Sequence, residues 1–84
     1  MKTVELQFPE TVFSALRKDP QEFARELRLT AAVKWYEMGQ ISQEKAAEIA
    51  GLSRFDFLAA LVRFNVSPFQ FNANELDEEV KNAL

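Results

Sequence analysis

With 84 residues, of which 48% are apolar and eight are Phe, the chain can build one small core, near the size at which a single core is only marginally sufficient. It contains neither Cys nor His, which excludes disulfides, metal ligation by these residues and His-based acid–base catalysis. The net charge of −3 argues mildly against DNA binding, but the excess acid lies near the C-terminus, at Glu75, Asp77, Glu78 and Glu79, whereas residues 1–40 are neutral.

The N-terminal segment, residues 3–8, alternates strictly between apolar and polar side chains. In a strand these would occupy opposite faces, with Val4, Leu6 and Phe8 on one face and Thr3, Glu5 and Gln7 on the other. No convincing second strand adjoins this segment, and a lone strand leaves its backbone N–H and C=O groups unpaired. We therefore expect it to pair with the same strand of a second chain across a two-fold axis, as a two-stranded ribbon. Pairing with residues 69–71 of the same chain is the alternative.

Two helices are predicted after Pro9. The first is short and covers residues 10–17. The second begins at Asp19-Pro20, where Asp19 is the N-cap and Pro20 takes the first helical position, and it should run to Met38. This second helix is apolar on most sides, more than an 84-residue monomer has material to cover, which is a further indication of a dimer.

Residues 41–64 predict two short helices joined by a tight turn. Ser42 and Ser53 are N-cap residues, and Gly51 can adopt the left-handed conformation that ends the first helix. This layout, with small residues where the two helices would cross closely and glycine at the turn, resembles a DNA-binding helix-turn-helix. An αα-hairpin with no nucleic-acid role is the alternative.

The second of these helices is predicted to have two faces. The apolar face would consist of Phe55, Phe57, Leu58, Leu61, Val62 and Phe64, and the opposite stripe of Asp56, Ala59, Ala60 and Arg63. A helix that reads bases normally offers Arg, Lys, Asn or Gln to the major groove, and here only Arg63, with Arg54 at the helix start, can do so.

The predicted ribbon is the second DNA-binding candidate. A two-stranded ribbon fits the major groove, where its outward side chains Thr3, Glu5 and Gln7 would reach base edges and Lys2 would contact phosphate. We favour the ribbon as the DNA-reading element because the polar stripe of the second helix, Asp56, Ala59, Ala60 and Arg63, offers so few hydrogen-bond donors to bases. A dimerisation ribbon whose outer face meets only water is the alternative.

No residue pattern predicts catalysis. Glu44 and Glu48 share a helix face but lack further metal ligands, and the serines lack a neighbouring base. The chain also lacks a signal peptide and any apolar run of the roughly 20 residues that span a membrane. We therefore predict a cytoplasmic binding protein that is not an enzyme and has no cofactor.

Residues 1–38 resemble a ribbon-helix-helix repressor subunit. Four sequence blocks distributed along the chain resemble an uncharacterised family of small prokaryotic predicted antitoxins that carry a helix-turn-helix: FPETVFSAL, DPQEFARELRLTAAVKWYEMGQIS, KAAEIAGLSRFDFL and VSPF. Members of that family are usually thought to accompany a PIN-domain-like ribonuclease toxin. The resemblance implies a homodimeric antitoxin that represses its own operon and neutralises the toxin with its C-terminal part, where Phe69, Phe71, Leu76 and Val80 are the candidate contacts. The competing hypothesis is a protein-interaction adaptor or inhibitor that does not bind DNA.

The expected fold is mainly α, with a short N-terminal β-strand followed by four to five helices. Residues 1–40 would form a ribbon-helix-helix-like dimerisation module, residues 41–66 the helix-turn-helix, and residues 67–84 the partner-binding tail of one compact unit.

Overall fold

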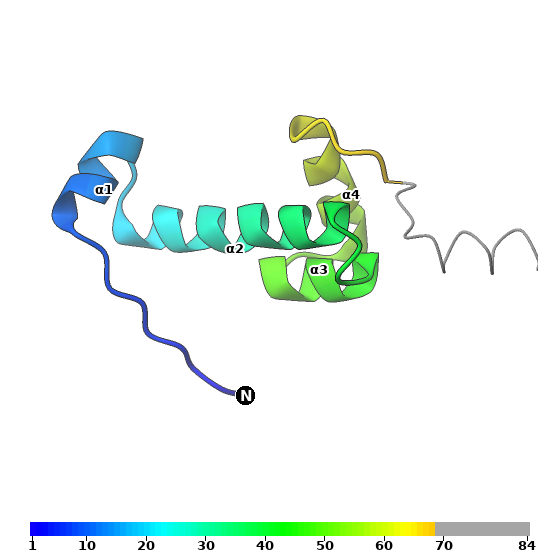
Figure 1. The fold of residues 1–84 in the computed structure, drawn as a ribbon, viewed down its shortest axis with the longest axis horizontal. Helices are drawn as coiled ribbons and strands as arrows, with labels where there is room; N and C mark the ends of the chain where they lie inside the picture. Colours follow the sequence, from blue (N-terminus) through cyan, green and yellow to red (C-terminus); the bar gives the residue numbers. More distant parts are fainter. Residues whose placement is uncertain (69–84) are drawn as a thin grey trace, which may run out of the picture.

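The computed structural model describes residues 1–68 as an all-α fold (Figure 1). Its helices are α1 (Glu10–Leu16), α2 (Pro20–Glu37), α3 (Gln43–Ala50) and α4 (Arg54–Arg63). Helix α2 is the longest, with α1 at its N-terminal end and α3 and α4 gathered at its C-terminal end (Figure 1). The prediction of a mainly α fold with four helices over this region is confirmed.

The starts of three helices follow from the local sequence. Asp19, Ser42 and Ser53 are the N-caps of α2, α3 and α4, and each accepts a hydrogen bond from the backbone N–H three residues later, at 2.8, 3.1 and 3.1 Å. Such caps satisfy a backbone donor that the first helical turn leaves free. All three predicted caps are confirmed.

Each helix ends next to a residue in the left-handed conformation. Gly39 (φ 76°) follows α2 and Gly51 (φ 72°) ends α3, as predicted. The other two are not glycines: Arg17 (φ 55°) ends α1, and Asn65 (φ 57°) follows α4. After α4 the N–H of Val66 bonds back to the carbonyl of Leu61 at 3.0 Å, which closes the last turn.

The main core lies where α3 and α4 pack at the C-terminal end of α2. Its buried members are Ala32, Val33, Tyr36, Ala46, Ala47, Phe57, Leu61 and Val66. Ala32 of α2 and Ala46 of α3 are fully buried, and their small side chains allow the two helices to approach closely.

A second, smaller cluster joins α1 to the start of α2. The ring of Phe23 lies 4.8 Å from that of Phe8 and 4.9 Å from that of Phe13, both in edge-to-face geometry. These contacts fix the point at which residues 1–7 leave the helical body.

The single chain does not form the predicted strand over residues 3–8. Residues 1–9 contain no regular secondary structure and are exposed, and residues 1–68 contain no strand. A strand needs a partner for its backbone groups, and the described part of the chain has none for this segment. The alternative partner at residues 69–71 and the predicted C-terminal helix lie outside the described residues.

Candidate nucleic-acid interface

Helices α3 and α4 are joined by residues 51–53, and a side chain from α2 supports this turn. The guanidinium Nε of Arg28 donates to the carbonyl of Ile49 at 2.8 Å. A Cβ atom on Gly51 would lie 3.1 Å from Nη2 of the same side chain. A cation at the C-terminal end of a helix interacts favourably with the helix dipole, so Arg28 stabilises the end of α3. Sequence reasoning missed this role, because no local motif links residues 21 positions apart.

Arg54, a predicted DNA contact, is tied to the start of α3. Its Nη2 and Nε atoms donate to Oε1 of Gln43 at 3.1 and 3.3 Å. The amide nitrogen of Gln43 in turn donates to the hydroxyl of Tyr36 at 2.9 Å and to the carbonyl of Pro68. The Tyr36 hydroxyl donates to the same carbonyl at 2.8 Å. This network joins the ends of three helices to the segment that follows α4.

Neither Tyr36 nor Gln43 was predicted to have a polar role. The one available signal was the tyrosine itself, because a buried tyrosine hydroxyl usually finds a hydrogen-bond partner. Tyr36 is 5% exposed, which agrees with that rule. Its partner at Pro68 lies 32 residues away and could not be found by local pattern.

Arg63, the other predicted contact on α4, lies far from Arg54. Nine residues of helix rotate a side chain by about 180°, so the two arginines project on opposite sides of α4. Arg63 lines a groove of about 600 Å³ between α2 and α4. The charged side chains of this groove have both signs: Lys18, Arg25, Arg28 and Arg63 against Glu22, Glu26 and Asp56. The mixture is unlike the basic stripe that usually contacts phosphates.

The predicted division of α4 into two faces is partly wrong. Phe57 and Leu61 are fully buried, but Phe55 is 80% and Val62 70% exposed. Ala60, assigned to the open stripe, is buried. The core covers only the side of α4 on which Phe57, Ala60 and Leu61 lie, so apolar residues on the far side remain in solvent.

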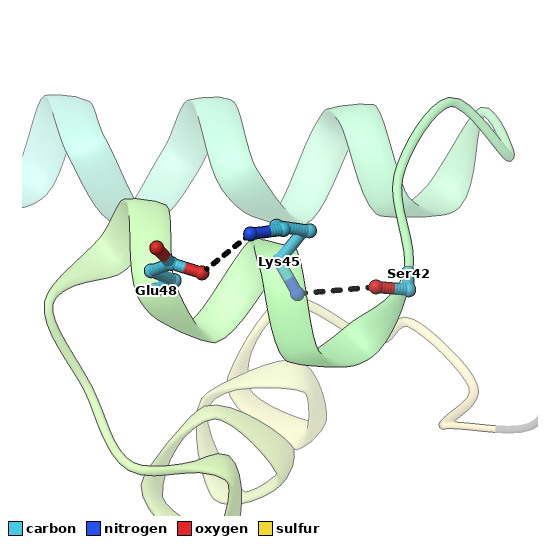
Figure 2. Close-up of polar contacts among 3 residues, drawn as sticks. All are labelled: Ser42, Lys45 and Glu48. Carbon is cyan, nitrogen blue, oxygen red and sulfur yellow. Dashed lines mark hydrogen bonds and ion pairs between the residues drawn. The ribbon is translucent and has the colours of Figure 1, made fainter.

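Helix α3 presents a neutralised charge pair to solvent. Nζ of Lys45 lies 3.0 Å from Oε2 of Glu48, and the backbone N–H of Lys45 bonds to the capping hydroxyl of Ser42 (Figure 2). The hydrogen bond to Glu48 and the charge of that carboxylate raise the pKa of the Lys45 ammonium group. Within the described range, no group of three or more acidic side chains could hold a metal ion.

The remaining predicted DNA contacts lie in the N-terminal segment. Lys2, Thr3, Glu5 and Gln7 are all exposed and precede α1. The structure therefore does not bring them together with Arg54 and Arg63 into one surface. The predicted toxin contacts Phe69, Phe71, Leu76 and Val80 lie outside the described residues.

Comparison with known proteins identifies the family. A family model described as "Uncharacterised protein family (UPF0175)" matches residues 1–84. The chain belongs to the UPF0175 family. Its family description contains no antitoxin or helix-turn-helix assignment, so these parts of the expectation stay predictions. No helix among the described residues is long and apolar enough to cross a membrane.

Relatives share the family assignment over most of their length. A UPF0175 protein of Aeropyrum pernix is 35% identical over 82 residues, covering 98% of this chain and 86% of the relative. A UPF0175 protein of Archaeoglobus fulgidus is 38% identical over 77 residues, covering 92% and 85%. A second Aeropyrum pernix relative is 39% identical over 59 residues, covering 70% and 75%. No solved structure matches the chain significantly.

Proposed function

We propose that this protein is an antitoxin-like transcriptional regulator without catalytic activity. Two chains form a homodimer that binds operator DNA through the N-terminal segment, and the C-terminal part neutralises a PIN-domain-like ribonuclease toxin. The observation that carries the DNA-binding part is an exposed, alternating segment held at one end by the helical body.

The exposure of this segment supports strand pairing between chains. Val4 and Leu6 are 78% and 61% exposed, although both are large and apolar. Phe8, the third residue of the apolar series, contacts Phe23 and so anchors the segment to α2. In an antiparallel ribbon, Val4 and Leu6 of the two chains would cover one another and bury apolar surface.

The first half of α2 also favours a dimer. Between Phe23 and Ala32 none of its residues is buried, and Leu16 at the end of α1 is 52% exposed. A second chain that joins the ribbon would lie beside α1 and this part of α2. In the single chain this surface is not buried, and such a partner would pack on it.

The ribbon is a better DNA reader than α4. Its polar face would offer Thr3 and Gln7 to base edges, with Lys2 placed for phosphate. The outward face of α4 instead carries Phe55 and Val62, which form no hydrogen bonds with bases.

Electrophoretic shifts of the DNA upstream of the gene test the proposal. Changing both Thr3 and Gln7 to Ala should reduce discrimination between operator and unrelated DNA. Lys2→Ala should weaken binding to every sequence and lower the salt dependence of log K by about 0.9 for each lost phosphate contact. The matched control is the Arg54→Ala/Arg63→Ala pair, which should leave sequence preference unchanged.

Two results would redirect the proposal. Loss of binding only in the Arg54/Arg63 pair would assign DNA recognition to α4. No shift by the wild-type protein at low salt, with or without its captured native partners, would favour the adaptor or inhibitor function. The exposed apolar side chains of α4 provide a specific reason to keep that second candidate.

A further inference from the structure

Helix α4 carries an apolar ridge on the side opposite its buried face. The α4 ridge consists of Phe55, Ala59 and Val62, which follow one another at spacings of four and three residues and therefore share one side of the helix. Phe55 and Val62 are 80% and 70% exposed, and Ala59 is also exposed. Helix α4 thus presents one apolar side to the core and another to solvent.

Opposite charges flank the α4 ridge on the side that borders the groove between α2 and α4. Asp56 and Arg63 are seven residues apart, which is about two helical turns, so they lie on nearly the same line along α4. Asp56 is near the start of the helix and Arg63 at its end. Ala59 lies close to the midpoint between them. The charge pattern of α4 is therefore complementary to the same pattern on a second, antiparallel copy of the helix.

We propose that the α4 ridge is a self-association surface on which two chains pack α4 against α4 in antiparallel orientation. The two-fold axis passes beside Ala59, where a small side chain permits close helix packing. In this geometry Phe55 faces Val62 of the second chain. The two-fold axis is perpendicular to both helices, so the charged residues of the two chains lie on the same side of the helix pair. Asp56 of each chain then faces Arg63 of the other, which gives two equivalent contacts.

A second copy fits this surface better than DNA does. The ridge is apolar, and Asp56 would repel phosphate, whereas the antiparallel pair covers the apolar side chains and neutralises both charges. The ridge is short, so the contact belongs to the class of small, reversible interfaces. It is separate from the N-terminal ribbon and does not depend on the proposed function. If both contacts form, ribbon dimers associate further through α4.

Disulfide trapping tests the position of the two-fold axis. The natural chain has no Cys, so Ala59→Cys introduces a single thiol at the proposed crossing. Disulfides form where Cα atoms approach to roughly 4.4–6.8 Å, which is expected only beside the axis. Under mild oxidation the variant should give a disulfide-linked pair of chains much faster than Glu44→Cys, an exposed site on α3. Equal rates for the two variants would overturn the proposal.

Charge reversal tests the pairing without a covalent bond. Asp56→Arg and Arg63→Asp each place like charges together at two symmetric contacts, so sedimentation equilibrium should show association about tenfold weaker. The double reversal should restore association, because each pair again has opposite signs. Glu44→Arg is the matched control, since it makes the same charge change in the first turn of α3.

Two outcomes contradict the proposal. In the first, association in the double reversal is as weak as in the single variants, or no variant differs from wild type. In the second, Arg63→Asp weakens DNA binding while the association of chains is unchanged, which would make DNA the occupant. Circular dichroism of each variant establishes that it is folded.

Discussion

Replacing Gly51 with Ala tests the turn that joins α3 to α4. Gly51 has φ 72°, a conformation that costs a residue with a Cβ atom about 1 kcal/mol or more. The new methyl group would also lie 3.1 Å from Nη2 of Arg28, so the guanidinium must shift by a few tenths of an ångström, which weakens its 2.8 Å hydrogen bond to the carbonyl of Ile49. Such a bond contributes about 1 kcal/mol. Because the bond is weakened and not removed, the expected loss in the free energy of unfolding lies between about 1 and 2 kcal/mol.

Thermal and urea unfolding of the wild type and five variants can separate these two causes. For a domain of this size, a loss of about 1–2 kcal/mol lowers Tm by roughly 4–16 °C. In an Arg28→Ala background, Gly51→Ala should cost only the backbone contribution of about 1 kcal/mol. Gly39→Ala is the matched control, because Gly39 is also left-handed (φ 76°) and its cost should be equal in both backgrounds. An unchanged Tm for Gly51→Ala would refute the turn assignment, and an equal cost in both backgrounds would refute the role of Arg28.

Two further substitutions test other features of the fold, and both are checked by thermal unfolding. Arg17→Gly should stabilise the protein by about 0.5–1 kcal/mol, because Arg17 ends α1 with φ 55° and glycine adopts this conformation without steric cost; a lower Tm would contradict that conformation. Tyr36→Phe should destabilise by about 1 kcal/mol, since it removes the hydroxyl bonded to both Pro68 and Gln43; no change in Tm would show that the network contributes nothing.

Sequence alone predicted the helix boundaries because those signals are local. A cap such as Ser53 and a stop such as Gly51 act within one helical turn, so their physical effects can be recognised from neighbouring residues. The bond from Arg28 to Ile49 and the bond from Tyr36 to Pro68 join residues 21 and 32 positions apart, and only the packed structure brings them together.

The faces of α4 illustrate a different limit. Phe55 and Phe57 are equally apolar, and periodicity assigned both to the buried face. Their positions differ by about 200° around the helix, and the core can cover only one side. Because α4 packs with the Phe57 side inward, Phe55 remains exposed. Which side is buried depends on how α4 docks, which its own sequence does not specify.

Hydrogen–deuterium exchange of the N-terminal amides tests the central claim, pairing of residues 3–8 between two chains. A two-stranded ribbon predicts slow exchange at alternate backbone amides of this segment in the wild-type protein. Protection should be lost in Leu6→Lys, which places a charge in the shared apolar face, while the amides of α2 and α3 serve as an internal reference for folding. Exchange at the rate of an unstructured peptide throughout residues 3–8 of the folded wild-type protein, with α2 and α3 protected, would contradict the account.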